Sequence, residues 1–271
     1  MLPLATFLKR PSRYSALSLL VGEGGISVSL DRSYGEHPRH RVDVYRPNKD
    51  IGGPVALFLY GGSWQGGCRS CYGFVGAALA RRGITTAIAD YRLYPEVRWP
   101  QFQEDAATAW SWVRRELVGT SARPAVVIGH SAGAHMASLL ALDRRWHGEA
   151  GPDALVGLSG PYTFSPTAWP STRDIFVTAR SADEPRPVTY VKPGAPRTLL
   201  LHGAEDGTVK PENSIGLAAA LRAHGNAVTH HLLDGIGHAG VITAIARPLR
   251  WRAPVLDLVA GFINALPEER A

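Results

Sequence analysis

The chain changes character most abruptly at residues 125–133, which read Ala-Val-Val-Ile-Gly-His-Ser-Ala-Gly. The first four residues form an apolar run of strand length, and residues 131–142 follow as a helical segment. A Gly-x-Ser-x-Gly pattern between a strand and a helix predicts a sharp turn that presents the serine hydroxyl at the edge of a sheet. Gly129 and Gly133 leave room for the neighbouring backbone. We therefore predict that Ser131 is a nucleophile.

Apolar runs on both sides of this turn predict a mostly parallel sheet. Runs without the alternation of a half-exposed strand are typical of parallel strands buried on both faces. They cover residues 54–60, 84–89, 125–128, 154–158 and 198–201, and a further strand is expected at 227–233. Helical segments are expected between and after them, at residues 72–82, 101–118, 131–142, 211–224 and 253–266. Strands that alternate with helices predict an α/β protein with helices on both faces of the sheet.

Two segments stand outside this alternation. Residues 26–31 and 41–46 alternate apolar and polar side chains, which predicts an antiparallel hairpin ahead of the parallel strands. Residues 160–196 contain seven prolines and little periodicity, so we expect them to form an excursion over the active site. The whole chain, 1–271, is expected to be a single domain, with residues 1–25 as an N-terminal segment.

Composition excludes several classes of protein. Hydrophobic residues make up 45% of the 271 residues and charged residues 19%, a balance that can bury a core and is unlike that of disordered chains. The 29 Lys and Arg exceed the 23 Asp and Glu by six, but the arginine pairs lie apart in the chain. We therefore expect a solvated surface and no nucleic-acid partner. No apolar run approaches the roughly 18 residues of a membrane span, so no stable membrane insertion is expected.

The N-terminus has some features of an export signal. Lys9, Arg10 and Arg13 precede an apolar stretch at residues 16–21, but no small-x-small cleavage site follows. We expect a short helix laid against the domain and a cytoplasmic protein, with export as the alternative.

The partners of the serine are expected at the ends of later strands. A serine nucleophile needs a neighbouring base, usually histidine, and an acid that orients the base. His238 lies in a loop after the last expected strand, and Asp206 follows the strand before it. Because the carboxyl ends of parallel strands share one edge of a sheet, we predict His238 as the base and Asp206 as the acid, with Glu205 as the competing acid. His130 and His135, close to the serine, are expected to be structural.

Backbone N–H groups for a developing oxyanion are expected from two places. The loop Tyr60-Gly61-Gly62-Ser63-Trp64 follows the first apolar run, and its glycines let N–H groups point inward. We assign the oxyanion hole to the amides of Gly62 and Ser63, together with that of Ala132 directly after the nucleophile. The candidates for the substrate pocket are Trp64, Tyr162 and Trp169.

Together these residues resemble the α/β-hydrolase superfamily. The resemblance is to its esterase branch, which includes hormone-sensitive-lipase-like carboxylesterases, kynurenine formamidases and prenylcysteine methylesterases. The matching pieces run in family order: Tyr60–Trp64, Asp90–Glu96, Gly129–Gly133, His202–Asp206 and Gly237-His238. The resemblance implies the α/β-hydrolase fold, the chain order serine, aspartate, histidine, and a supporting role for Asp90–Glu96 near the active-site loops. The family's oxyanion loop usually begins with His, where this chain has Tyr60.

The expected activity is that of a serine hydrolase that cleaves small carboxylic esters through an acyl-enzyme on Ser131. An amidase or formamidase with the same triad is the nearest alternative, and a non-catalytic binding protein of the hydrolase fold is a second. No cofactor and no metal are expected, since phosphate-loop, dinucleotide and HExxH motifs are missing from the sequence. Cys68-x-x-Cys71 lacks both the second ligand pair of a zinc site and a thioredoxin-like context, so we expect no function for it.

Overall fold

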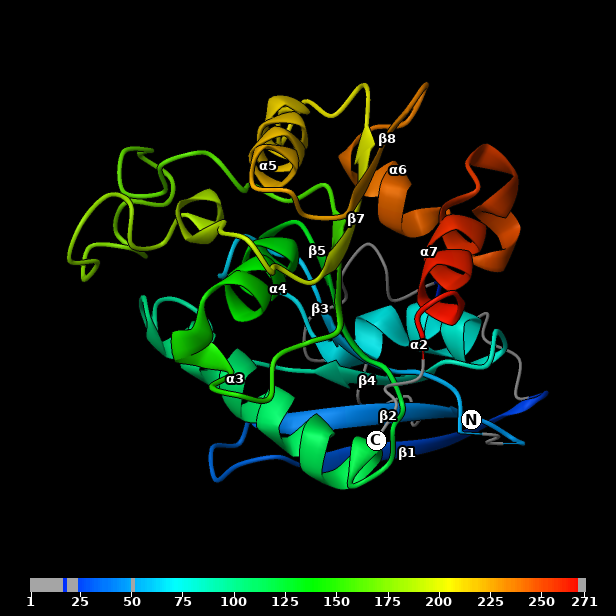
Figure 1. Ribbon diagram of the computed structural model, residues 1–271. Helices are drawn as coiled ribbons and strands as arrows, with labels where there is room; N and C mark the ends of the chain where they lie inside the picture. The colour runs from blue at the N-terminus through cyan, green and yellow to red at the C-terminus, as the bar shows by residue number, and fades with distance from the viewer. Residues whose placement is uncertain (1–16, 19–23, 50–51, 268–271) are drawn as a thin grey trace.

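One sheet of eight strands runs through the protein, whose computed structural model describes residues 17–18, 24–49 and 52–267 (Figure 1). The strands are β1 (Ile26–Ser33), β2 (Arg41–Pro47), β3 (Val55–Leu59), β4 (Thr85–Ala89), β5 (Ala125–His130), β6 (Ala154–Leu158), β7 (Arg197–Gly203) and β8 (Val228–Leu233). Their order in the sheet is β1-β2-β4-β3-β5-β6-β7-β8. β2 pairs antiparallel with both β1 and β4, whereas all other neighbours are parallel. The expected hairpin and the mostly parallel sheet are therefore confirmed.

The register of the central strands brings three loops to one edge of the sheet. Leu59, at the end of β3, lies opposite Ala89 of β4 and Gly129 of β5. The segments that follow these strand ends therefore emerge side by side: the loop after β3, Asp90 after β4, and Ser131 after β5. Ligands of open α/β sheets bind at this carboxyl edge.

Helices cover both faces of the sheet, as the alternation of strands and helices predicts (Figure 1). On one face, α2 (Gly73–Ala80) and α7 (Val255–Asn264) contact each other. On the other lie α3 (Gln101–Val113), α4 (Ala132–Leu142) and α5 (Glu212–Ala223). α3 continues into one wider turn at residues 114–118, so the helical segment expected at 101–118 is confirmed over its full length.

Close packing of α4 on the sheet explains the glycines around the serine. Every residue of β3, β4, β5 and β6 is buried, as expected for strands covered on both faces. A Cβ on Gly133 would come within 2.0 Å of the Leu59 carbonyl oxygen, and one on Gly129 within 2.2 Å of the Gly133 carbonyl oxygen. Any larger residue at either position would push the helix away from the strands.

The proline-rich excursion, residues 160–196, leaves the sheet after β6 and returns to it at β7. It is bound to α4, because the His135 Nε2–H donates a hydrogen bond to the Pro185 carbonyl (2.6 Å). The ring of Phe176 lies edge-on to that of Trp64, with 4.9 Å between the ring centroids. The excursion therefore reaches the loop that follows β3. Its role as a cover of the active site stays a prediction.

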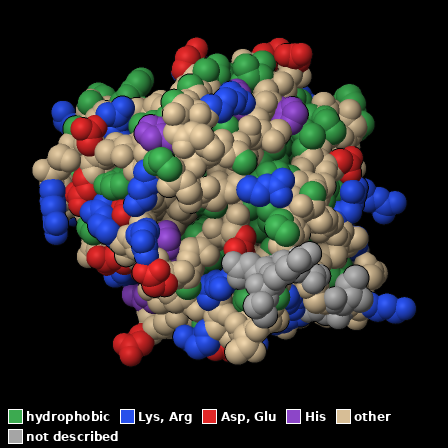
Figure 2. Space-filling view, viewed as in Figure 1, with side chains coloured by type: hydrophobic (Ala, Val, Ile, Leu, Met, Phe, Trp, Pro, Cys, Tyr) green, Lys and Arg blue, Asp and Glu red, His purple; other side chains and the backbone are tan. Residues whose placement is uncertain are grey.

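The charged surface is mixed. On the face shown in Figure 2, Lys and Arg side chains lie interspersed with Asp and Glu and form no continuous basic area. Several arginines pair with nearby carboxylates, for example Arg145 with Asp143 at 2.6 Å and Arg186 with Asp183 at 2.5 Å. On this face the surface thus has the mixed character expected of a solvated one, and a solvent-accessible pair such as Arg186 with Asp183 contributes little to stability.

The N-terminal expectations fall largely outside the described residues. Of the signal-like stretch at 16–21, the structure describes only Leu17 and Ser18. The Ser18 hydroxyl donates a hydrogen bond to the Cys71 carbonyl (2.8 Å). Among the helices of the described chain, none has the length and apolar character needed to cross a bilayer.

Candidate active site

Ser131 occupies the turn between β5 and α4. Its backbone has φ 55° and ψ −122°, a region that residues other than glycine seldom occupy. Its N–H donates to the carbonyl of Leu158 in the neighbouring strand β6 (2.9 Å), which holds the turn in place. A Cβ on Gly61 would come within 2.8 Å of the Ser131 Cβ, so the loop after β3 lies directly against the serine. Only 9% of the residue's surface is exposed.

His238 contacts Ser131 although 107 residues separate them in the chain. Its Nε2 lies 2.9 Å from the Ser131 Oγ. The prediction that His238 lies in a loop is wrong, since it begins a short helix, α6 (His238–Thr243), after β8. The His130 ring packs against the His238 ring, with 5.0 Å between centroids, and its Nε2–H donates to the His238 carbonyl (3.2 Å). The imidazole is thus supported from β5 as well as from its own helix.

Asp206 completes the contact chain from the end of β7. Its Oδ2 lies 2.7 Å from His238 Nδ1, and its Oδ1 accepts hydrogen bonds from the N–H groups of Thr208 and Val209 (2.9 Å each). Burial alone would raise the pKa of Asp206, but hydrogen bonds from His202, His238 and the Val209 N–H outweigh it. They hold the pKa of this carboxyl well below its usual range, so Asp206 carries a negative charge at neutral pH.

His202 is a member of this site that the sequence analysis did not assign. It is completely buried on β7, with Nε2 2.9 Å from the Val209 carbonyl and 3.3 Å from Asp206 Oδ2. Both neighbours are acceptors, so Nε2 carries the proton and donates to the carboxylate. In the sequence, only its position four residues before Asp206 indicates that His202 belongs to the site. Glu205, the competing acid, is exposed, and it is Asp206 that contacts His238.

The loop expected to form the oxyanion hole has an unusual backbone. Gly62 has φ 146°, and Ser63 and Trp64 have φ 53° and 58°, which costs a non-glycine residue on the order of 1–3 kcal/mol. Among the described residues, no acceptor pairs with the backbone N–H of Gly62, Ser63 or Ala132. Ala132 is the first residue of α4, where helix N–H groups are free and the helix dipole is positive. Three N–H donors without a partner among the described residues are therefore available, one beside Ser131 in the chain and two in the loop whose Gly61 lies against it.

These contacts define what the site can do chemically. With Asp206 charged, His238 Nδ1 carries a proton and its Nε2 is left as an acceptor for the Ser131 hydroxyl. The arrangement can therefore remove the serine proton during attack on an electrophilic carbon. Within the described ranges, no three His, Cys, Asp or Glu side chains come together as metal ligands.

Comparisons with known proteins show that this chain is similar to esterases. The BD-FAE family model matches residues 42–152 of the chain. Esterase LipC of Mycobacterium tuberculosis (strain ATCC 25618 / H37Rv) is 30% identical over 268 residues, which cover 88% of this chain and 65% of LipC. The solved structure of Thermogutta terrifontis esterase 2 superposes with a TM-score of 0.74 at 21% identity, over 89% of this chain and 94% of that one.

This chain has the α/β-hydrolase fold, and its sequence is similar to those of esterases. A second relative, the probable isoprenylcysteine alpha-carbonyl methylesterase ICMEL1 of Oryza sativa subsp. japonica, is 30% identical over 80% of this chain and 58% of its own length. The chain thus spans 65% and 58% of these two curated relatives.

Two of the three pocket residues expected in this α/β-hydrolase lie in the core instead. Tyr162 is completely buried and packs with Leu200 and Leu217, so it offers no surface to a substrate. Trp64 is 3% exposed, because its ring is enclosed by other aromatic side chains that include Phe176. Trp169 is 58% exposed, and its part in a pocket stays a prediction. Burial of a single aromatic side chain depends on distant elements that the local sequence does not reveal.

Stability of this α/β-hydrolase should depend on pH through His135. Burial lowers the pKa of His135 to about 4, although its hydrogen bond to the Pro185 carbonyl opposes the shift. An unfolded histidine binds a proton below pH ~6.5, so the folded state should lose stability as the pH falls from about 6.5 to about 4. The full contribution is about 3 kcal/mol.

We expect His135→Gln, which keeps a donor but does not titrate, to lose about 3 kcal/mol less than the wild type between pH 7 and pH 4. Urea unfolding at several pH values measures this difference. His224→Gln, at the exposed end of α5, is the control and should follow the wild type. Parallel curves for the wild type and His135→Gln would contradict the assignment.

Proposed function

We propose that this chain is a serine carboxylesterase with Ser131 as nucleophile, His238 as general base and Asp206 as the residue that orients the base. The observation that carries the proposal is the unbroken pair of contacts, 2.9 and 2.7 Å, that joins Ser131 Oγ through His238 to Asp206. A binding protein has no need of a complete triad, which supports a catalyst over a non-catalytic member of the fold.

The reaction follows from this geometry. Ser131 Oγ attacks the ester carbonyl carbon while its proton passes to His238 Nε2. The amides of Gly62, Ser63 and Ala132 bind the oxyanion, each donor worth about 3 kcal/mol. His238 then gives the proton to the leaving oxygen, which departs as an alcohol and leaves the acyl group on the serine. Water, deprotonated by the same imidazole, releases the carboxylic acid.

Small esters are the proposed substrates. The relatives named as an esterase and as a methylesterase support an oxygen rather than a nitrogen leaving group. Trp64, Phe102 and Phe176 pack against one another beside the oxyanion loop, with ring centroids 4.9 to 6.2 Å apart. All three rings are buried against one another, which supports a short acyl group on this side of the loop.

Substrate preference can be tested with matched esters and amides. We expect kcat/KM on p-nitrophenyl acetate to exceed that on p-nitroacetanilide and N-formylkynurenine by more than about a hundredfold, and to fall as the acyl chain lengthens to octanoate. Amides demand protonation of a poorer leaving group, for which His238 is the available acid. A higher kcat/KM on N-formylkynurenine would favour the formamidase instead.

The sheet is shared by all the described strands, which supports one α/β-hydrolase domain with residues 160–196 bordering the active site.

The Cys68–Cys71 disulfide bears on the compartment of the protein. It weighs against the cytoplasm, where thiols are kept reduced. It supports export, the alternative that the signal-like N-terminal stretch leaves open.

A further inference from the structure

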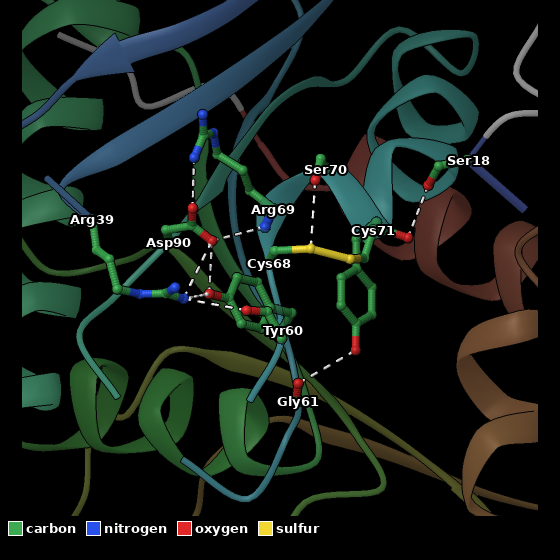
Figure 3. Close-up of a disulfide and its surroundings, with 11 residues drawn as sticks. Ser18, Arg39, Tyr60, Gly61, Cys68, Arg69, Ser70, Cys71 and Asp90 are labelled. Carbon is green, nitrogen blue, oxygen red and sulfur yellow. Dashed lines mark hydrogen bonds and ion pairs between the residues drawn. A yellow bond between two sulfur atoms is a disulfide. The ribbon is translucent and has the colours of Figure 1, made fainter. Parts of the chain in front are cut away.

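The first residue of the oxyanion loop, Tyr60, is held by two hydrogen bonds on its hydroxyl and by rings on both faces. Its hydroxyl donates to Asp90 Oδ1 (2.7 Å) and accepts from Arg39 Nη2 (2.9 Å). Its ring stacks between those of Tyr72 and Tyr91, with centroid distances of 5.4 and 4.8 Å. The side chain is completely buried, at the junction of β3 and the loop (Figure 3).

The same group of residues holds both ends of the segment 60–67, which contains the oxyanion loop. At its start, the Tyr91 hydroxyl donates to the Tyr60 carbonyl (2.8 Å). At its end, Arg39 Nη2, which already binds the Tyr60 hydroxyl, also donates to the Gly67 carbonyl (3.2 Å). A Cβ on Gly67 would come within 2.6 Å of the Tyr60 ring, so the loop closes back onto this tyrosine. The phenol therefore lies where the two ends of the loop meet.

Asp90 is in turn fixed by Arg69. The Arg69 N–H donates to Asp90 Oδ1 (2.8 Å), and its Nη1 donates to Oδ2 (2.5 Å). The rest of the guanidinium binds Asp43 (2.9 Å) and Asp31 (2.6 Å). We refer to Arg39, Tyr60, Arg69 and Asp90 as the Asp90 clamp. A guanidinium that binds three carboxylates has little freedom to move, so the Asp90 carboxylate has a defined position.

The backbone of Arg69 is closed into a small ring. Cys68 and Cys71, the only cysteines of the chain, form a disulfide around Arg69 and Ser70 (Figure 3). The Cys71 N–H donates to the Cys68 carbonyl (3.1 Å), and the Cys71 carbonyl accepts from Ser18. The cysteine pair, for which we expected no function, thus encloses Arg69 of the Asp90 clamp.

We propose that Tyr60 is a positioning residue for the oxyanion hole, and that the Cys68–Cys71 ring holds Arg69, and through it Asp90, against the Tyr60 hydroxyl. The loop needs such an anchor, because Ser63 and Trp64 adopt left-handed backbone conformations that persist only when the surroundings impose them. With the anchor cut, the Gly62 and Ser63 amides move from the place where the oxyanion forms. The proposal rests on the serine carboxylesterase function.

Tyr60→Phe removes only the hydroxyl. We expect kcat on p-nitrophenyl acetate to fall about tenfold while KM stays close to that of the wild type, because the oxyanion exists only in the transition state. Tyr45→Phe is the matched control: Tyr45 is also buried, and its hydroxyl has no partner among the described residues. Equal kcat values for the two variants would overturn the proposal, whereas failure of the wild type to hydrolyse any ester would overturn the esterase function itself.

Reduction of the disulfide tests the second part of the proposal, the role of the Cys68–Cys71 ring. One thiolate of a dithiol such as dithiothreitol attacks Cys68 Sγ, which is half-buried, and expels the Cys71 thiolate. The second thiol of the reagent then displaces Cys68 and closes a cyclic disulfide, so one protein disulfide becomes two thiols as one dithiol is oxidised. We expect kcat to fall severalfold in the wild type.

The loss on reduction should be much smaller in Tyr60→Phe, where the connection to the loop is already broken. A variant with both Cys68→Ser and Cys71→Ser should be slow from the start and unaffected by the dithiol. An unchanged kcat after reduction, or the same loss in the wild type and in Tyr60→Phe, would overturn the role of the ring.

Discussion

Replacement of Ser131 by Ala should lower kcat on p-nitrophenyl acetate by about 10⁴-fold or more, to the residual rate that binding and the oxyanion hole alone provide. The substitution removes one oxygen atom that lies 2.9 Å from His238 Nε2. Alanine and serine have the same backbone constraints at φ 55°, so the turn itself should survive. Steady-state kinetics, with thermal unfolding as a check on the fold, measure the effect.

Ser138→Ala is the matched control for this loss. Ser138 is buried on α4, the helix that begins directly after Ser131. Its hydroxyl has no hydrogen-bond partner among the described residues. This variant should keep wild-type activity and should still be labelled by a fluorophosphonate, which Ser131→Ala should not be. Full activity of Ser131→Ala would end the proposal of a serine nucleophile.

Asp206→Asn should lower kcat by about 10³- to 10⁴-fold at neutral pH. The carboxylate, 2.7 Å from His238 Nδ1, keeps the proton on that nitrogen and stabilises the imidazolium that forms during attack. An asparagine amide can present its NH₂ group to Nδ1 instead, which turns the imidazole into the wrong tautomer. Since hydrogen bonds hold the pKa of Asp206 well below its usual range, the acidic limb of the activity profile should not arise from this residue.

Glu205→Gln removes a carboxylate at the adjacent position and is the control. Glu205 is exposed, so we expect this variant to retain wild-type kcat. Measurement of kcat for both variants from pH 5 to about 9 shows which of the two carboxylates supports catalysis. A large loss in Glu205→Gln together with little effect of Asp206→Asn would reverse the assignment.

The errors of the sequence analysis share a physical cause. Helix α6, which starts at His238, is six residues long and too short to show a periodic pattern. Tyr162 follows β6 in the chain, but its burial depends on side chains of β7 and α5. His202 reads as one residue of a buried strand until its contact with Asp206 is seen. In each case the deciding neighbour is set by packing and not by adjacent residues.

Residue patterns within single segments predict the strands, the hairpin, the larger helices and the chain order of Ser131, Asp206 and His238. These depend on apolar periodicity and turn chemistry, which act over a few residues. The tertiary structure decided which distant groups meet: His238 with Ser131 across 107 positions, and Arg69 with Asp90 across 21. Such contacts follow from strand order and register, because hydrogen bonds between side chains require a spatial proximity that only the assembled sheet creates.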